Sequence, residues 1–164
     1  MSSLLDVSWA DARFDEMMTS RLAVWRKDQS PDQYNLVSNV VYTRLSCTMV
    51  NGKLAGQTVD RVPCLDQALK GYELNTPPAP QSETSYGIQT YKVFCRLFTL
   101  LDSPAALTIR HFLQVLTKAQ VDAGADFPDP NDANAKAVLY NVTDIENPAL
   151  MDHHLELYAT VITP

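Results

Sequence analysis

Val40-Val-Tyr-Thr-Arg-Leu-Ser-Cys-Thr-Met-Val50 is the stretch of this sequence with the clearest conformational preference, and Asn51-Gly52 follows it directly. β-Branched and apolar residues dominate the stretch and favour an extended chain. Asn-Gly is the dipeptide that most readily takes the two positive φ angles of a type I′ turn. Residues 53–62 then return as a second extended segment, so the sequence predicts a β-hairpin over 40–62.

Three further segments are predicted to be strands. Tyr86–Leu101 alternates, with apolar residues on both faces toward its C-terminal end, which is typical of a central strand covered on two sides. Lys136–Asp144 and His153–Thr163 show strand patterns as well, and we expect them to be the last two strands.

Two long helices are predicted, one before the hairpin and one after the long strand. The first begins at Ser8, which can cap it, and ends before Pro31. Its apolar stripe comprises Phe14, Met17, Met18, Leu22 and Trp25. The second begins at Ser103-Pro104 and runs to Val121. Its stripe comprises Ile109, Phe112, Leu113, Leu116 and Ala119. A short helix, opened by Pro63, is predicted over Cys64–Lys70.

These elements predict an α+β fold with a mixed, mainly antiparallel sheet of about five strands, packed by the N-terminal helix and the central helix. The length of 164 residues fits a single domain, 1–164. Two long loops are expected between the regular elements, a Pro-rich surface loop at 73–84 and an acidic loop at 122–135. Surface loops of this kind tend to carry contacts.

The formal net charge is −6, from 13 Lys and Arg against 19 Asp and Glu. This charge is a poor match to phosphate backbones and anionic lipid, so neither sequence-specific nucleic-acid binding nor a membrane partner is expected. No apolar run approaches the roughly 18 residues of a membrane span. The N-terminal residues carry neither a basic nor an apolar signal region, so we expect a protein that is not secreted.

No catalytic, cofactor or metal residue is predicted. His153 and His154 are adjacent, so a strand would point them to opposite faces. The acidic loop lacks the Gly and Glu that an EF-hand requires, and we interpret it as a solvated loop. The cysteines are expected to be buried apolar residues, with an intermolecular disulfide as the alternative. They are Cys47, Cys64 and Cys95.

Charged residues of the first helix are given ordinary structural roles. Asp15 and Glu16 are interpreted as lying on its exposed face, where they are not a catalytic pair. Arg21, Arg26 and Lys27 are interpreted as cations near its end, where they meet the helix dipole.

The order of elements in the second half of the chain permits a comparison. A long strand (Tyr86–Leu101) runs into a Ser-Pro-capped helix (Ser103–Val121), then the acidic loop, then strands that end in Leu155-Glu-Leu-Tyr-Ala-Thr-Val-Ile162. With the N-terminal helix and the early hairpin, this order resembles the tail-terminator and tail-completion (neck) proteins of long-tailed bacteriophages. The resemblance implies an α+β subunit that forms a ring, commonly a hexamer, which caps the tail tube and meets the neck.

The same resemblance implies a structural protein and not an enzyme. Its place would be the virion, assembled in the host cytoplasm, and its partners would be copies of itself and other tail and neck proteins. Hairpin and loop residues could reach neighbours in such a ring. The candidate interaction residues are Asn51, Gly52, Thr76, Pro77, Pro78, Pro80, Asp126 and Asp129.

Two alternatives stay open. One is a small α+β enzyme or ligand-binding module with a pocket between helix and sheet. The first residues to mutate in that case are Tyr42, Tyr91, Asp102 and His111. The other alternative is a capsid or decoration protein.

Overall fold

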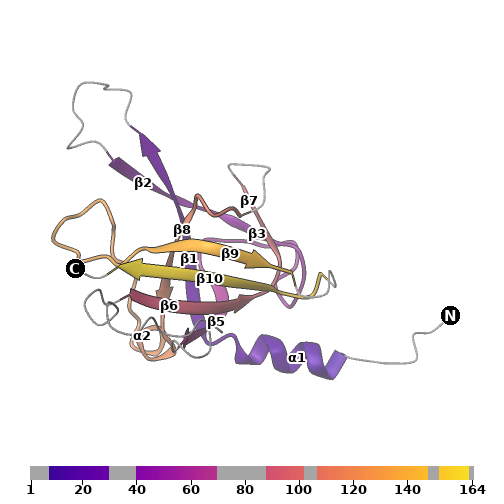
Figure 1. The fold of residues 1–164 in the computed structure, drawn as a ribbon. Coiled ribbons are helices and arrows are strands. Elements are labelled where there is room, and N and C mark those ends of the chain that lie inside the picture. Colours follow the sequence, from indigo (N-terminus) through magenta and orange to yellow (C-terminus); the bar gives the residue numbers. More distant parts are fainter. Residues whose placement is uncertain (1–7, 30–39, 70–87, 102–106, 148–151, 163–164) are drawn as a thin grey trace, which may run out of the picture.

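Six antiparallel strands close into a β-barrel in the computed structural model, which describes residues 8–29, 40–69, 88–101, 107–147 and 152–162 (Figure 1). The order around the barrel is β1-β5-β6-β10-β9-β8. Pairs from Arg21↔Leu116 to Trp25↔Phe112 join β8 back to β1 and complete the closure. The barrel strands are β1 (Ser20–Gln29), β5 (Val62–Leu69), β6 (Ile88–Cys95), β8 (Phe112–Leu116), β9 (Tyr140–Glu146) and β10 (Leu155–Ile162).

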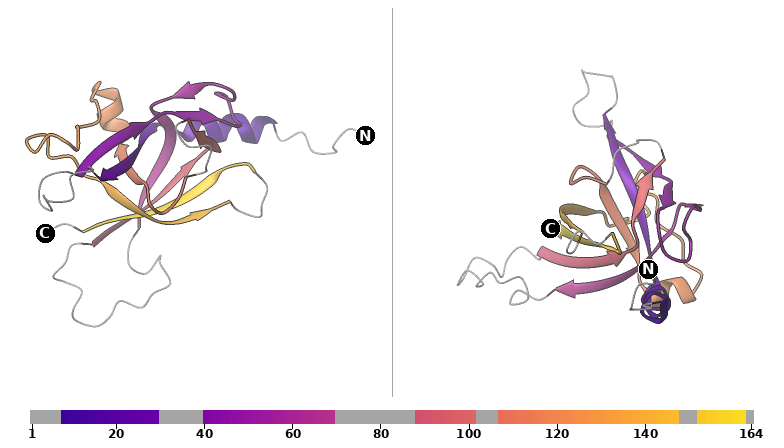
Figure 2. Two further views of the ribbon diagram at one scale, coloured as in Figure 1. Left: turned by 90° about the horizontal axis from the view of Figure 1, so that it is seen from above. Right: turned by 90° about the vertical axis from the view of Figure 1, so that its right-hand side faces the viewer.

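One strand pair extends beyond the barrel. β1 is shared, because its first residues pair with β5 while its second half pairs with β2 (Val40–Leu45), from Val24↔Leu45 to Gln29↔Val40. β1 and β2 therefore project from the barrel as a two-stranded arm (Figures 1 and 2).

A second, three-stranded sheet packs on the same core. It contains β4 (Thr58–Val59), β3 (Cys47–Met49) and β7 (Phe98–Leu100), in that order. The residues of β3 and β7 that face inward share a hydrophobic cluster with the barrel interior. The two sheets thus share one main core.

Side chains fill the barrel interior. Alternate residues of a strand point to one face, and a barrel of this small size leaves room for side chains only. The largest fully buried side chains from the barrel strands are Leu22, Val24, Val62, Cys64, Val93, Cys95, Leu113 and Leu157.

Two short helices accompany the strands, α1 (Ser8–Met17) and α2 (Lys118–Asp122). Thr117 and Gln120 form a capping box at the start of α2, which satisfies backbone N–H groups there. Among the described residues, neither helix is long and apolar enough to cross a membrane.

The predicted first helix is correct for Ser8–Met17 and wrong beyond it, where the chain forms β1. Leu22 and Val24 point into the barrel, while Ala23 and Trp25 are buried on the other face beneath Phe127. Because both faces of the strand are buried, its apolar residues also fit a helical spacing.

The predicted central helix over Ser103–Val121 is also wrong. Phe112–Leu116 forms β8, and only Lys118–Asp122 is helical, while 102–106 lies outside the described residues. The predicted short helix over Cys64–Lys70 is part of β5 instead. In the described residues the fold is therefore a closed β-barrel with two short helices, and the predicted α+β sheet packed by an N-terminal and a central helix is incorrect.

Other strand predictions agree with the structure. β9 and β10 correspond to the last two predicted strands, and β6 and β7 lie within the predicted long strand, separated at Arg96–Leu97. The hairpin exists as β3 paired with β4, although its loop spans several residues and Val40–Leu45 pairs with β1. The acidic loop continues without strand or helix after α2, whereas the Pro-rich loop at 73–84 lies outside the described residues.

Candidate functional site

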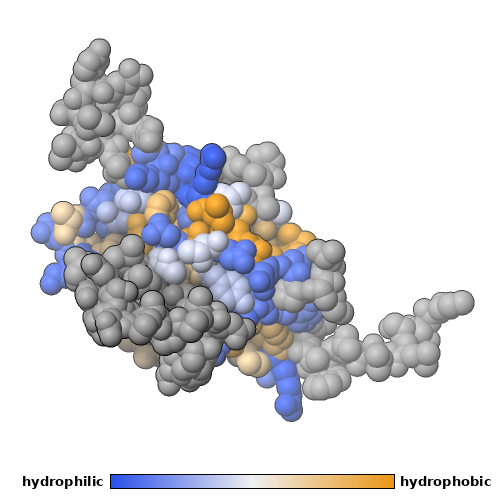
Figure 3. All heavy atoms as spheres, in the orientation of Figure 1, coloured by the Kyte–Doolittle hydropathy of each residue, from blue (hydrophilic) through white to orange (hydrophobic). Residues whose placement is uncertain are grey.

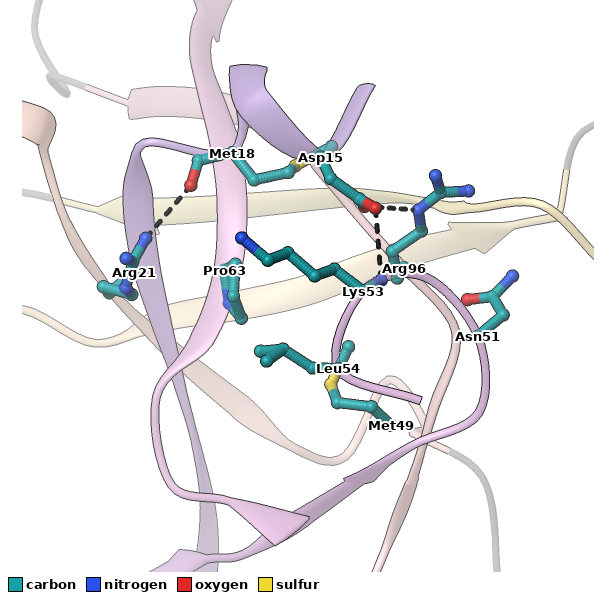
Figure 4. A pocket seen from close by; sticks show the side chains of 9 residues that line it. All are labelled: Asp15, Met18, Arg21, Met49, Asn51, Lys53, Leu54, Pro63 and Arg96. Carbon is teal, nitrogen blue, oxygen red and sulfur yellow. Dashed lines mark hydrogen bonds and ion pairs between the residues drawn. The ribbon is translucent and has the colours of Figure 1, made fainter. Parts of the chain in front are cut away.

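A pocket of about 240 Å³ lies between the end of α1, the starts of β1 and β5, and the loop after β3 (Figure 4). We call it the cationic pocket, because Arg21, Lys53 and Arg96 line it together with the single carboxylate of Asp15. Its apolar wall comprises Met18, Met49, Leu54 and Pro63.

The Arg96 guanidinium and the Asp15 carboxylate form the fixed part of this pocket. Arg96 is 5% exposed, and its Nε donates to Asp15 Oδ1 at 2.8 Å. The second carboxylate oxygen of Asp15 accepts from the backbone N–H of Lys53 at 3.1 Å. The guanidinium also lies 4.6 Å from the ring centre of Phe14 and donates to the carbonyl of His153 at 3.2 Å. Asp15 is thus half-buried and paired, contrary to its predicted exposure on a helix face.

The other two cations of the pocket have no acidic partner among the described residues. Arg21 Nη1 donates to the carbonyls of Met18 and Ser20, at 3.0 and 2.9 Å, and these acceptors carry no formal charge. Lys53 is exposed; its side chain extends across the pocket, and its ammonium lies on the side of Arg21 (Figure 4). Arg21 lies in β1, four residues after α1 ends, so it is not part of the predicted helix, although it donates to the carbonyl of Met18 next to the end of α1. The pocket therefore concentrates positive charge in a protein of net charge −6.

The predicted interaction residues Asn51 and Gly52 hold the loop of this pocket. Asn51 Nδ2 donates to the carbonyls of Asp152 and His153 at 2.6 and 2.9 Å, and its Oδ1 accepts from the N–H of Leu97 at 3.0 Å. Gly52 has a φ of +80° and lies directly against Arg96. Both residues thus make contacts within their own chain.

The other predicted interaction residues lie elsewhere. Asp126 and Asp129 are exposed on the acidic loop, and Asp126 forms an ion pair with Arg61 at 2.7 Å. Asp129 accepts from the N–H and the side-chain amide of Asn131, at 2.8 and 3.0 Å. Four further residues lie outside the described residues, namely Thr76, Pro77, Pro78 and Pro80.

The residues of the ligand-binding alternative have separate surroundings. The ring of Tyr42 packs on Phe112 at 5.5 Å, and His111 contacts Thr108. Burial lowers the pKa of His111. Asp102 lies outside the described residues. The predicted central helix is absent, since its described residues form β8 and α2 with the segments beside them, but Gln120 of α2 lines a pocket against the sheet.

Tyr91 lines a different pocket, of about 280 Å³, at one end of the barrel. Its ring lies 4.9 Å from that of Tyr140, and Asp66 lines the same pocket and accepts a hydrogen bond from Ser20 Oγ. Burial and the neighbouring Tyr91 raise the pKa of Tyr140 to about 12. The Tyr140 phenol is therefore a neutral hydrogen-bonding group at physiological pH.

Thiol and metal chemistry have little support in the described part of the chain. All three cysteines are buried and free, and burial raises the pKa of Cys47 to about 12. A thiol at such a pKa is a poor nucleophile. His153 and His154 precede β10, and their Nδ1 atoms lie 2.9 Å apart, so the predicted opposite orientation is wrong. No group of three metal-ligating side chains is found among the described residues.

The outward face of the three-stranded sheet is a second unusual surface. We call it the outer sheet face, and it comprises Thr48, Val50, Thr58, Thr99 and Leu101. Backbone bonds from Val50 to Leu97 and from Leu101 to Ser46 continue the β3–β7 ladder, so both apolar residues belong to this face. Val50 is 54% exposed and Leu101 61% exposed. Figure 3 shows one face of the molecule, on which a group of hydrophobic residues lies near the centre among hydrophilic ones.

Comparisons of the chain with protein-family models, with curated proteins and with solved structures found no match.

Proposed function

We propose that this chain is a structural subunit that acts through protein–protein contacts, chiefly with copies of itself. The observation that carries the proposal is the outer sheet face. Solvent-facing strand residues are normally polar or charged. Here none of the five residues of the face is charged, and two of them are large apolar side chains more than half exposed. Val50 and Leu101 lie at opposite ends of the β3–β7 ladder, and a partner that covers the face would remove both apolar side chains from water.

The strand order of the small sheet supports the same function. β7 lies at an edge of that sheet and contains only Phe98, Thr99 and Leu100. Edge strands that must stay unpaired usually carry Lys, Pro or a bulge, because their free N–H and C=O groups pair readily with another chain. β7 has no such residue, so it can contact a neighbouring subunit through its edge as well as its face.

The barrel interior supports a function at the surface. Buried apolar side chains fill it, so it offers no central cavity of the kind that larger barrels use for ligands. The contacts that give this protein its function are therefore expected on its exterior.

A virion tail or neck is the assembly that the sequence resemblance suggests. That resemblance included a helix over 103–121, but in the described part of this range only the residues of α2 are helical and Phe112–Leu116 is a strand, so the proposal depends on the surfaces and not on the order of elements. Neighbouring genes for a major tail, sheath or portal protein would test the virion assignment. The alternative structural role is that of a capsid or decoration protein.

Light scattering coupled to size exclusion tests the proposal over a range of concentrations. The wild-type protein is expected to form oligomers, and Leu101→Asp to weaken them about tenfold or more, since burying one Leu contributes about 1.5–3 kcal/mol. Val138→Asp is the matched control, because Val138 is 47% exposed and lies outside the outer sheet face. A wild-type protein that stays monomeric at high concentration, or equal effects of the two variants, would contradict the proposal.

A further inference from the structure

The charge of the cationic pocket favours an anionic ligand. Asp15 already neutralises Arg96. Arg21 and Lys53 face the same pocket, and neither forms an ion pair with a described residue. The apolar wall excludes water from one side of any group that enters, and this strengthens an electrostatic contact there. A volume of about 240 Å³ admits one or two side chains. A short acidic segment of a protein thus fits the pocket in both charge and size.

The acidic loop, 122–135, carries carboxylates of two kinds. Asp122 pairs with Lys118 and Asp126 pairs with Arg61, so both are neutralised within the chain. Asp129 and Asp132 are exposed and form no ion pair with the described residues. Each uses Oδ1 to accept N–H groups of its own loop, at 2.8 Å from Asn131 and 2.9 Å from Asn134.

Contacts with the barrel hold this loop in place. Asn131 binds both backbone groups of Tyr42, with its Oδ1 accepting at 2.8 Å and its Nδ2 donating at 2.9 Å. Phe127 is buried with the guanidinium of Arg44 4.8 Å from its ring centre, and Gln114 donates to the carbonyl of Pro128. A loop held in this way loses little conformational entropy when it binds a partner.

The part of the acidic loop that carries Asp129 and Asp132 lies far from the pocket of the same copy, although Asp126 pairs with Arg61, two residues from the pocket residue Pro63. Tyr42 pairs with Lys27 on β1, six residues from Arg21, and strand residues rise by roughly 3.3 Å each, so about 20 Å separates the two positions. The acidic loop, drawn between α2 and β9, lies at the end of the molecule opposite α1 (Figures 1 and 2). A contact between loop and pocket therefore requires two molecules.

We infer that the acidic loop of one copy enters the cationic pocket of the next, with Asp129 and Asp132 facing Arg21 and Lys53. This inference rests on the self-assembly proposed above and specifies one of its contacts. The two surfaces differ, so the contact is head-to-tail, and it generates a ring if the rotation closes and a filament if it does not. The net charge of −6 opposes association only weakly, because salt screens distant charges beyond about 8 Å at physiological ionic strength.

Charge variants of the two surfaces test the inference. Lys53→Glu reverses the exposed pocket cation, while Asp129→Asn with Asp132→Asn removes the loop charges and keeps the Oδ1 acceptors. Each variant is expected to weaken association by about tenfold or more, measured by light scattering at several salt concentrations. Arg110→Glu is the control, because it changes the net charge as Lys53→Glu does at an exposed site outside both surfaces. Far-UV circular dichroism and thermal unfolding establish that every variant is folded.

A mixing experiment gives the sharpest result. The Lys53→Glu protein keeps its loop, and the doubly substituted loop variant keeps its pocket, so an equimolar mixture retains one intact contact per pair. The mixture is expected to associate about tenfold or more strongly than either variant alone at the same total concentration, because only the mixture contains an intact loop–pocket pair.

Other outcomes separate the inference from the function on which it rests. Wild-type oligomers that both variants reproduce unchanged would overturn the loop–pocket contact and leave the proposed assembly in place. A wild-type protein that is monomeric throughout would overturn the proposed self-assembly. If that monomer binds an Asp- and Glu-rich peptide, and Lys53→Glu abolishes the binding, the occupant is a different protein and the second-copy inference is wrong.

Discussion

Replacing Gly52 with alanine places a methyl group against the side chain of Arg96. Its Cβ would lie 2.8 Å from Arg96 Cγ, 3.0 Å from Nε and 3.1 Å from Cδ. Cγ is close to the backbone, so the arginine relieves this clash only by rotating its whole side chain. That rotation carries Nε away from the carboxylate of Asp15, which it contacts at 2.8 Å.

Two costs contribute to the expected loss of stability. The φ of +80° at Gly52 is left-handed, and a residue with a Cβ in that conformation costs roughly 1–2 kcal/mol. Losing the charge-assisted hydrogen bond between Arg96 and Asp15 costs about 1.5–3 kcal/mol. The free energy of unfolding is therefore expected to fall by about 2.5–5 kcal/mol. With an m-value of about 2 kcal/mol/M, the urea midpoint falls by about 1.2–2.5 M.

Gly56 supplies a matched control. Its φ is +79°, nearly the same as that of Gly52, but a Cβ there would meet nothing within 4 Å. Gly56→Ala is thus expected to cost only the backbone contribution of roughly 1–2 kcal/mol. Alanine also lowers the conformational entropy of the unfolded chain relative to glycine. This effect is the same in both variants and cancels when their stabilities are compared.

Urea unfolding followed by tryptophan fluorescence measures both variants, alone and in an Arg96→Ala background. The excess cost of Gly52→Ala over Gly56→Ala is expected in the wild-type background and should vanish when Arg96 is absent. Equal destabilisation by the two alanines in the wild-type background would refute the reasoning, because the clash with Arg96 would then contribute nothing.

Gln114 and His111 give two further predictions. Gln114 is buried and accepts a hydrogen bond from the indole N–H of Trp25 at 2.9 Å. Gln114→Leu should therefore lower the free energy of unfolding by about 1–3 kcal/mol, measured by urea titration. An unchanged free energy of unfolding would contradict this role. Burial lowers the pKa of His111 from its ordinary value of 6.5. The imidazole therefore binds a proton more readily in the unfolded state than in the folded state. The free energy of unfolding should fall as the pH drops below 6.5. Melting temperatures from pH 7.5 to 5.5 should show a smaller fall for His111→Gln than for the wild type, and identical slopes would exclude His111 as the cause.

Two strands with buried apolar residues on both faces, β1 and β8, were mistaken for helices. β10 alternates regularly, and its pattern predicted a strand correctly. In β1, by contrast, Leu22 and Trp25 are both buried, although they point to opposite faces. A three-residue spacing of buried apolar residues is also what an amphipathic helix produces. β8 has the same ambiguity, because Leu113 faces the interior while Leu116 packs on the outside.

Barrel closure depends on contacts that no local pattern reveals. β1 and β8 pair across about ninety residues of sequence, as Trp25 with Phe112 shows. The pocket has the same property, since Asp15, Lys53 and Arg96 come from three separate segments. Sequence reasoning placed Asn51-Gly52 in a turn, but the predicted type I′ turn is wrong, because only Gly52 has a positive φ and residues 50–57 join β3 to β4. Arg96 was missed because a charged residue in a predicted strand normally indicates an exposed side.

The stability prediction at Gly52 bears directly on the inferred contact. Arg96 holds Asp15, and Asp15 in turn holds the backbone N–H of Lys53, so these buried groups position a pocket cation without touching the ligand. Gly52→Ala breaks the first of these interactions. It should therefore weaken association at temperatures where the protein is still fully folded, and Gly56→Ala should not. A variant with normal fold and assembly but a lost Arg96–Asp15 pair would show that the position of Lys53 is set by some other contact.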